Sequence, residues 1–242
     1  MSKNIFAKGI LHLIPTPLGE NPPLEVLPLS VKKAVENLNY YIVENEKIAR
    51  RFIKKITPQK NQEDLILFPL NKYTAQQEID TYLHPCLNGI SIGLMSDAGC
   101  PGIADPGAAI VSKAHANEIK VMPHVGPSSI ILALMSSGLN GQNFAFNGYL
   151  PIDKKQRSQS IIRYEKEALR NQQAQLFIET PYRSDALFQE LILTLSPTTL
   201  LCVACNLNQN DEFVLTQSVH QWKKFIPNFN KRPCIFIVDT GF

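Results

Sequence analysis

The stretch from Ser91 to Gly107 constrains the fold of this chain more than any other part of the sequence. It begins with five apolar or small residues, Ser91 to Met95, a run that is typical of a short buried strand. Three glycines, two prolines and two aspartates follow within a dozen positions. Glycine permits a positive φ and a close approach to the backbone, whereas proline fixes φ at about −65°. The stretch therefore predicts a strand, a turn of defined shape, and a helix that Asp105 caps with Pro106 at its first position.

This order of strand, glycine-rich turn and helix N-terminus is one by which α/β proteins hold a small ligand at the carboxyl end of a sheet. Glycine-rich turns are also common as plain connections between a strand and a helix. The residues of this stretch, taken alone, leave both interpretations open.

The rest of the chain alternates short apolar runs with amphipathic stretches. The expected strands span 10–14, 40–43, 65–68, 91–95, 119–122, 144–146, 176–179, 200–205, 212–216 and 234–238. The expected helices span 30–38, 44–55, 74–88, 106–117, 130–137, 153–170, 181–193 and 219–225. This alternation predicts an α/β fold, with mostly parallel pairing in the first half and hairpin-like strands late in the chain. We expect an N-terminal α/β domain over residues 1–123 and a C-terminal α/β domain over residues 124–242.

Composition and hydropathy favour a globular protein of the cytoplasm. The 242 residues are 44% apolar and 19% charged, which supplies ample core material. No run approaches the roughly 18 apolar residues that a membrane span needs. The apolar run Gly9–Ile14 is short and ends at Pro15, so no signal peptide is evident.

The five cysteines do not suggest a metal centre. Cys202 and Cys205 have the spacing of a metal or redox pair, but they lie in an apolar run that is typical of a strand. Alternation along a strand would point the two thiols to opposite faces, and no second pair completes a zinc site. We therefore expect cysteines of the core and no bound metal.

The net charge of +3 is mild, but the cations are clustered. Residues 47–60 hold six cations and no acid, and at helical spacing five of the cations share one face. A second cluster comprises Lys154, Lys155, Arg157 and Arg163. Such faces can bind RNA phosphates or simply be solvated, and the spacing is compatible with both.

Four segments resemble one family in order and spacing. Residues 94–107 resemble the Ser-Asp-Ala-Gly-Thr-Pro-Gly-Ile-Ser-Asp-Pro-Gly segment of the ribosomal RNA small-subunit methyltransferase I family, a branch of the tetrapyrrole (class III) methylases. Residues 15–19 are similar to its first turn, residues 126–151 to its central block, and residues 179–183 to its Glu-Ser-Pro-His-Arg segment. Together these segments span nearly the whole chain.

The resemblance implies a fold, a cofactor and an activity. The expected fold is the two-domain one of the tetrapyrrole methylases, with S-adenosylmethionine in the cleft between the domains and usually two identical subunits. The expected reaction is methylation of a ribose 2′-hydroxyl, that of a cytidine, in small-subunit ribosomal RNA. Two alternatives remain: a methylase of a tetrapyrrole or other small molecule, and a non-catalytic relative that binds RNA or the cofactor.

The resemblance also assigns candidate site residues. Glu44 and Lys47 are the catalytic candidates, although each could instead be a charge at a helix terminus. The cofactor-binding candidates are Pro17, Asp97, Ala98, Gly99, Gly102, Ile103, Ser128, Ser129, Glu179 and Thr180. The chain departs from the family pattern near the expected substrate side, with residues 44–47 in place of Glu-Asp-Thr-Arg, residues 205–207 in place of Arg-Glu-Leu, and Glu20 in place of Asn.

Overall fold

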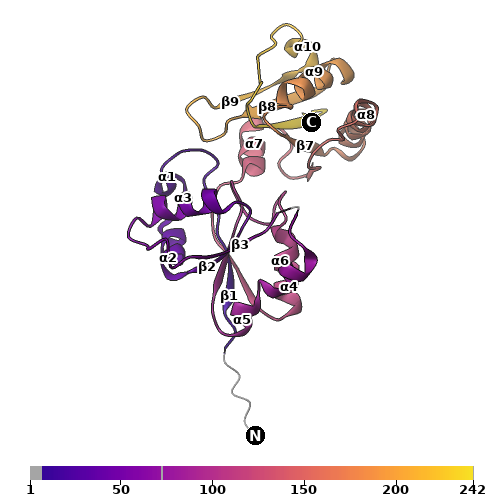
Figure 1. The fold of residues 1–242 in the computed structure, drawn as a ribbon. Coiled ribbons are helices and arrows are strands. Elements are labelled where there is room, and N and C mark those ends of the chain that lie inside the picture. Colours follow the sequence, from indigo (N-terminus) through magenta and orange to yellow (C-terminus); the bar gives the residue numbers. More distant parts are fainter. Residues whose placement is uncertain (1–6, 72, 242) are drawn as a thin grey trace. The chain divides into compact units, whose positions relative to one another are not determined.

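The computed structural model describes residues 7–71 and 73–241 (Figure 1). The chain forms two compact units, of which the first ends at Ser128 and the second begins at Ser129. The boundary expected from the sequence, after residue 123, therefore lies in the last loop of the first unit.

The first unit is built on a five-stranded sheet in the order β3-β2-β4-β1-β5. Every pair in this sheet is parallel, as expected for the first half of the chain. Its strands are β1 (Ile10–Leu13), β2 (Tyr40–Val43), β3 (Ile66–Pro69), β4 (Ile92–Met95) and β5 (Lys120–Pro123). β4 is buried along its whole length because it lies in the middle of the sheet with helices on both faces.

Helices cover both faces of this sheet (Figure 1). One face carries α1 (Pro23–Val26), α2 (Leu29–Asn37) and α3 (Glu46–Ile56), and the other carries α4 (Gln76–Thr81), α5 (His84–Leu87) and α6 (Gly107–Ala116). Each face of the sheet has its own hydrophobic core, because successive side chains of a strand point to opposite faces. In β2, Tyr41 and Val43 pack against the helices of the first face, and Ile42 packs against those of the second.

The prediction of one helix over residues 74–88 is wrong about where the helix begins and about its being continuous. The structure has two short helices there, α4 and α5, and α4 has Ala75 as its N-cap. The Thr74 hydroxyl instead accepts the amide of Asn71 at 2.9 Å and donates to the carbonyl of Pro69 at 3.2 Å. Thr74 therefore closes the turn after β3 and does not form the expected capping box.

The second unit is built on a mixed sheet in the order β6-β7-β10-β8-β9. β6 and β7 pair in parallel, and the other three pairs are antiparallel, as expected for late hairpin-like strands. Its strands are β6 (Phe144–Phe146), β7 (Ala174–Glu179), β8 (Leu200–Cys205), β9 (Phe213–Ser218) and β10 (Cys234–Asp239). Its helices are α7 (Ser129–Ser137), α8 (Lys154–Asn171), α9 (Ser184–Thr194) and α10 (Val219–Trp222).

Aromatic side chains dominate the core on one face of the second sheet. Trp222 is fully buried, stacks edge-on against Phe188, and donates its indole N–H to the carbonyl of Leu201 at 2.8 Å. On the opposite face, the Thr216 hydroxyl donates to the last carbonyl of α7, that of Ser137, at 2.7 Å. The two faces are therefore covered by α8 and α9 on one side and by α7 on the other.

The expectation of plain core cysteines needs one correction. Cys205 and Cys234 form a disulfide, and they stand directly opposite each other in β8 and β10 with a Cα–Cα distance of 4.4 Å. Cys86 and Cys202 are buried free thiols, as expected. Cys202 and Cys205 do point to opposite faces, since Cys205 belongs to the aromatic core while Cys202 hydrogen-bonds Thr216.

Candidate active site

Three segments meet at the carboxyl edge of the first sheet, where open α/β sheets bind ligands. Residues 14–22 follow β1, Glu44 follows β2, and residues 96–106 follow β4. The first and third segments are joined by two backbone hydrogen bonds: the Thr16 amide donates to the Gly99 carbonyl at 3.0 Å, and the Gly99 amide donates to the Thr16 carbonyl at 3.1 Å. The loop after β4 is therefore anchored to the loop after β1.

The loop after β4 has a defined backbone shape because three of its residues adopt a positive φ. Gly99 has φ +77°, Gly102 has φ +85°, and the non-glycine Ala104 has φ +61°. A Cβ on Gly99 would lie 3.2 Å from a methyl carbon of Leu18 and 3.4 Å from the carbonyl oxygen of Pro127. At Gly102, by contrast, a Cβ would meet nothing closer than 4.0 Å, so the backbone there faces open space.

Asp105 closes this loop with its carboxylate. The carboxylate accepts the amide of Gly102 at 2.9 Å and the amide of Gly107 at 2.6 Å. Burial raises the pKa of Asp105, and the hydrogen bonds from Gly107, Gly102 and Ile103 oppose that rise. The expected cap is thus only partly right, because α6 has Pro106 as its N-cap and Asp105 lies outside the helix, where it binds the helix and the loop together.

The carboxyl group of Glu44 lies against the start of the loop, next to Asp97. The Glu44 carboxylate accepts the amide of Asp97 at 3.0 Å. Burial raises the pKa of Glu44, and the nearby charges of Asp105 and Asp97 raise it further, against the effect of that hydrogen bond. Burial also raises the pKa of Asp97, which the amide of Asn45 partly offsets. A half-buried carboxylate with a raised pKa is suited to accept a proton in catalysis.

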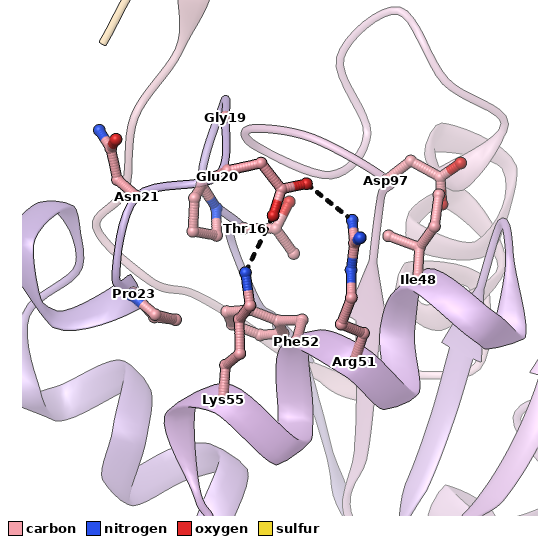
Figure 2. Close-up of a pocket in the computed structure, with 11 residues that line it drawn as sticks. Thr16, Gly19, Glu20, Asn21, Pro23, Ile48, Arg51, Phe52, Lys55 and Asp97 are labelled. Carbon is pink, nitrogen blue, oxygen red and sulfur yellow. Dashed lines mark hydrogen bonds and ion pairs between the residues drawn. The ribbon is translucent and has the colours of Figure 1, made fainter. Parts of the chain in front are cut away.

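A small, open pocket lies next to these groups (Figure 2). It is lined by the loop after β1, by one side of α3 and by Asp97. In Figure 2 the Glu20 side chain extends toward Arg51 and Lys55; one carboxylate oxygen lies 3.0 Å from the Arg51 Nη2 atom, and the other lies 3.0 Å from the Lys55 Nζ atom. Of the cofactor candidates, Pro17 and Asp97 line this pocket.

The N-terminus of α3 holds the second catalytic candidate. Asn45 is the N-cap, and its side chain accepts the amides of Lys47 and Ile48 at 3.0 and 3.2 Å. The Lys47 side chain is exposed in the first turn of the helix. Glu44 lies just before this cap, so the two catalytic candidates belong to one short segment at the sheet edge.

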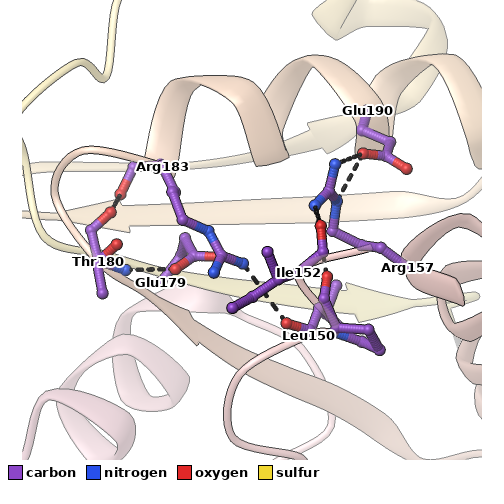
Figure 3. A network of polar contacts seen from close by, with 9 residues as sticks. Leu150, Ile152, Arg157, Glu179, Thr180, Arg183 and Glu190 are labelled. Atoms are coloured by element: carbon purple, nitrogen blue, oxygen red, sulfur yellow. Dashed lines mark hydrogen bonds and ion pairs between the residues drawn. The ribbon is translucent and has the colours of Figure 1, made fainter. Parts of the chain in front are cut away.

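The candidates in the second unit shape a turn at the end of β7 (Figure 3). The buried Glu179 carboxylate accepts the amide of Thr180 at 2.7 Å and pairs with Arg183 at 2.6 Å. The Thr180 carbonyl accepts the amides of Arg183 and Ser184. The helix expected from residue 181 therefore begins only at Ser184, because residues 180–183 form this turn.

The second basic cluster is smaller than the sequence indicates. Arg157 is mostly buried and pairs with Glu190 at 2.6 Å, and its guanidinium also donates to the carbonyl of Ile152 at 2.8 Å (Figure 3). Arg163 pairs with Glu167 on α8, while Lys154 and Lys155 are exposed. Arg157 thus fixes α8 to α9 and contributes no cation to the surface.

The structure brings together part of the predicted site. Pro17 and Asp97 line the same pocket, and the Glu44 carboxylate accepts the Asp97 amide. Ala98, Gly99, Gly102 and Ile103 belong to the same loop as Asp97, with Ala98 and Ile103 exposed. Ser128 ends the first unit, and Ser129 is the first residue of α7. Ser129, Glu179 and Thr180 belong to the second unit.

Sequence reasoning missed two features of this edge. The first is the role of Asp105 as the closure of the loop, since the Asp-Pro-Gly pattern indicates only a helix start. The second is the contact of Glu20 with α3, which spans 31 residues to Arg51 and 35 to Lys55, so no local pattern signals it. Within residues 7–71 and 73–241, no three side chains of the metal-binding types gather where they could hold an ion. No helix of these same ranges is long and apolar enough to cross a bilayer.

Two solved structures are similar to this chain over most of its length. The solved structure of a diphthine synthase has a TM-score of 0.68 at 13% identity, covering 95% of this chain and 89% of that one. That of the methyltransferase CobJ has a TM-score of 0.63 at 15% identity, covering 96% and 94%. At such low identity these likenesses show the fold alone, which is the expected fold of the tetrapyrrole methylases.

The curated relatives carry the family assignment. No family model matches the chain. The ribosomal RNA small subunit methyltransferase I of Buchnera aphidicola subsp. Schizaphis graminum is 27% identical over 97% of this chain and 79% of its own length. That of Synechocystis sp. is 30% identical over 84% of this chain and 69% of its own length. On this similarity, the chain belongs to the ribosomal RNA small subunit methyltransferase I family.

Proposed function

We propose that this protein transfers a methyl group from S-adenosylmethionine to a ribose 2′-hydroxyl, that of a cytidine, in small-subunit ribosomal RNA. One observation carries the proposal: a loop fixed by Gly99, Gly102 and Asp105 lies beside the raised-pKa carboxyl group of Glu44, at the ligand-binding edge of the sheet. The relatives named above are ribosomal RNA methyltransferases, which supports both the chemistry and the acceptor.

The loop after β4 fits S-adenosylmethionine by its shape and its donors. The open space beside Gly102 lets a ligand approach the backbone without an intervening side chain. Ala98 and Ile103 are exposed residues of this loop, and Asp97 offers a carboxylate for an ammonium or a ribose hydroxyl. Pro17 completes the same surface from the loop after β1. When bound, the cofactor supplies an electrophilic methyl group on a sulfonium.

We assign Glu44 as the base that accepts the proton of the ribose hydroxyl. Its raised pKa makes it a stronger base than an ordinary carboxylate, and the hydrogen bond from the Asp97 amide holds its orientation. Lys47, exposed in the first turn of α3, is assigned to hold a phosphate of the acceptor near this carboxylate. Positioning of this kind can lower a barrier by about 7–11 kcal/mol.

Ser128, Ser129, Glu179 and Thr180 stay cofactor-binding predictions from the resemblance. Glu179 would act by holding the turn at the end of β7, since its carboxylate accepts the Thr180 amide and pairs with Arg183. The homodimer and the cytoplasmic location stay predictions from the resemblance. Sedimentation of the purified protein tests the first, and fractionation of the host cell tests the second.

Two measurements in sequence test the proposal. Calorimetry should detect S-adenosylmethionine at a dissociation constant on the order of micromolar, which is about −8 kcal/mol. Methyl transfer is then assayed on small ribosomal subunits from a host strain that lacks this gene. Binding without transfer to RNA would favour a non-catalytic relative, and transfer to a tetrapyrrole pool would favour a small-molecule methylase.

A further inference from the structure

The cations of α3 are not equivalent, although the sequence places them on one face. Arg50 donates to the carbonyl of Gln62 at 2.7 Å, and Lys54 donates to the carbonyl of Pro58 at 2.9 Å. Both are therefore engaged with the backbone that follows the helix. Arg51 and Lys55 lie one turn apart on the side of α3 that lines the pocket (Figure 2).

Arg51 and Lys55 share one anion. One oxygen of the Glu20 carboxylate lies 3.0 Å from Arg51 and the other lies 3.0 Å from Lys55, so a single carboxylate bridges the two cations. The pKa of Glu20 is lowered by its hydrogen bond to Lys55 and by the charges of Arg51 and Lys55. Two cations that hold the two oxygens of one carboxylate, one with a planar fork and one with a compact ammonium, form a receptor for an oxyanion such as phosphate.

The ion pairs of Glu20 with Arg51 and Lys55 can give way to another anion. All three side chains are exposed, and the exposed fraction of the Glu20 side chain is 72%. Exposed ion pairs add little to stability because water competes for both partners. Glu20 also lies in a loop between β1 and α1, where its side chain can turn away without disturbing the core.

We propose that Arg51 and Lys55 bind one phosphate of the RNA backbone, and that the Glu20 carboxylate occupies this site in the free protein and leaves when RNA binds. The inference rests on the proposed function, since it takes RNA as the acceptor. The same pocket is lined by Pro17 and Asp97, so a phosphate held there would anchor the RNA strand beside the proposed cofactor loop. Glu20 stands where the family motif has Asn, so this competing carboxylate is a departure from that motif.

The experiment measures the affinity of a short end-labelled single-stranded RNA across a series of salt concentrations. Glu20→Gln removes the competing charge, so binding should tighten about two- to fivefold at low salt, in keeping with a weak exposed ion pair. The double variant Arg51→Gln, Lys55→Gln should weaken binding and flatten the log–log salt slope by about 0.7, because one RNA phosphate is no longer neutralised. Glu36→Gln is the matched control, because it removes the same charge from another exposed ion pair, that with Lys32.

The decisive arm combines the variants. If Glu20 acts by occupying the site, Glu20→Gln should have no effect on RNA affinity once Arg51 and Lys55 are both replaced. If Glu20 only repels RNA at a distance, its replacement would tighten binding equally in both backgrounds, and the proposal would be overturned. An effect of Glu36→Gln as large as that of Glu20→Gln would overturn it as well.

Separate readouts keep this inference distinct from the proposed function. The affinity for S-adenosylmethionine, measured by calorimetry, should stay unchanged in all variants; a loss in the Arg51→Gln, Lys55→Gln variant alone would assign the site to the cofactor's own carboxylate and overturn the proposal. Methylation of small subunits by the wild-type protein, with an unaltered RNA salt slope in that double variant, would overturn the phosphate site and leave the proposed function standing. Absence of methylation by the wild type would instead count against the proposed function.

Discussion

Replacing Asp105 by Ala tests whether the loop after β4 owes its shape to one carboxylate. That carboxylate accepts the amides of Gly107 at 2.6 Å and of Gly102 at 2.9 Å. Hydrogen bonds to a charged group contribute about 1.5–3 kcal/mol each. Part of this is offset because the variant no longer buries a carboxylate, the cost that raises the pKa of Asp105. We therefore expect the free energy of unfolding of the first unit to fall by about 2–4 kcal/mol.

The assay is urea unfolding followed by far-ultraviolet circular dichroism, which reports on both units, and by the fluorescence of Trp222, which reports on the second. Trp222 is the single tryptophan of the chain and is fully buried in the second unit. The dichroism transition should move to lower urea in the Asp105→Ala variant. The control is Asp64→Ala, an exposed aspartate of the same unit, which should change stability by less than about 0.5 kcal/mol.

The same variant connects the loop to ligand binding. In conditions where Asp105→Ala stays folded, its affinity for S-adenosylmethionine should fall, because the backbone at Gly102 is no longer held. Asp105→Asn keeps the shape and one acceptor oxygen, so it should lie between the wild type and the Ala variant in both measurements. The reasoning is refuted if Asp105→Ala loses no more stability than Asp64→Ala.

Three further predictions concern single residues. Gly99→Val should abolish cofactor binding in calorimetry, because the residue has φ +77° and its Cβ would press on the Leu18 side chain; unchanged affinity would remove this loop from the site. Glu190→Gln should cost about 3 kcal/mol, since it leaves the mostly buried guanidinium of Arg157 without its counter-charge, and unfolding by tryptophan fluorescence measures it; a loss below about 1 kcal/mol would show the pair to be incidental. Because the pKa of Glu44 is raised, kcat/KM should fall as pH drops through a value above that of an ordinary carboxyl group, and a profile that is flat there would contradict its role as base.

Most of the fold could be predicted because its signals are local. β4 lies within the five residues expected as a strand, Ser91 to Met95, and Asp153 caps α8 as its spacing to Gln156 indicates. The prediction fails where a side chain has a partner across a turn. The Thr74 hydroxyl bonds back to the turn after β3, and the Glu179 carboxylate holds residues 180–183 in a turn, so both expected helices begin late.

The site could be predicted only where its residues lie close together in the sequence. The glycines of the loop after β4 are visible because positive φ is a local requirement, and Gly99 and Gly102 both meet it. The disulfide could not be predicted, since the pairing of Cys205 with Cys234 depends on the register of two strands, and the two cysteines are 29 residues apart. The contact of Glu20 with α3 is hidden for the same reason.

Methyl transfer to the ribosomal RNA can be followed directly with a labelled methyl group. Wild-type protein is incubated with methyl-labelled S-adenosylmethionine and small ribosomal subunits from a host strain that lacks this gene, and the digested nucleosides are resolved by mass spectrometry. We predict label in 2′-O-methylcytidine, which is absent with the Glu44→Gln variant while that variant still binds the cofactor. Label absent from the RNA of the wild-type reaction, with the cofactor bound at full occupancy, would contradict this prediction.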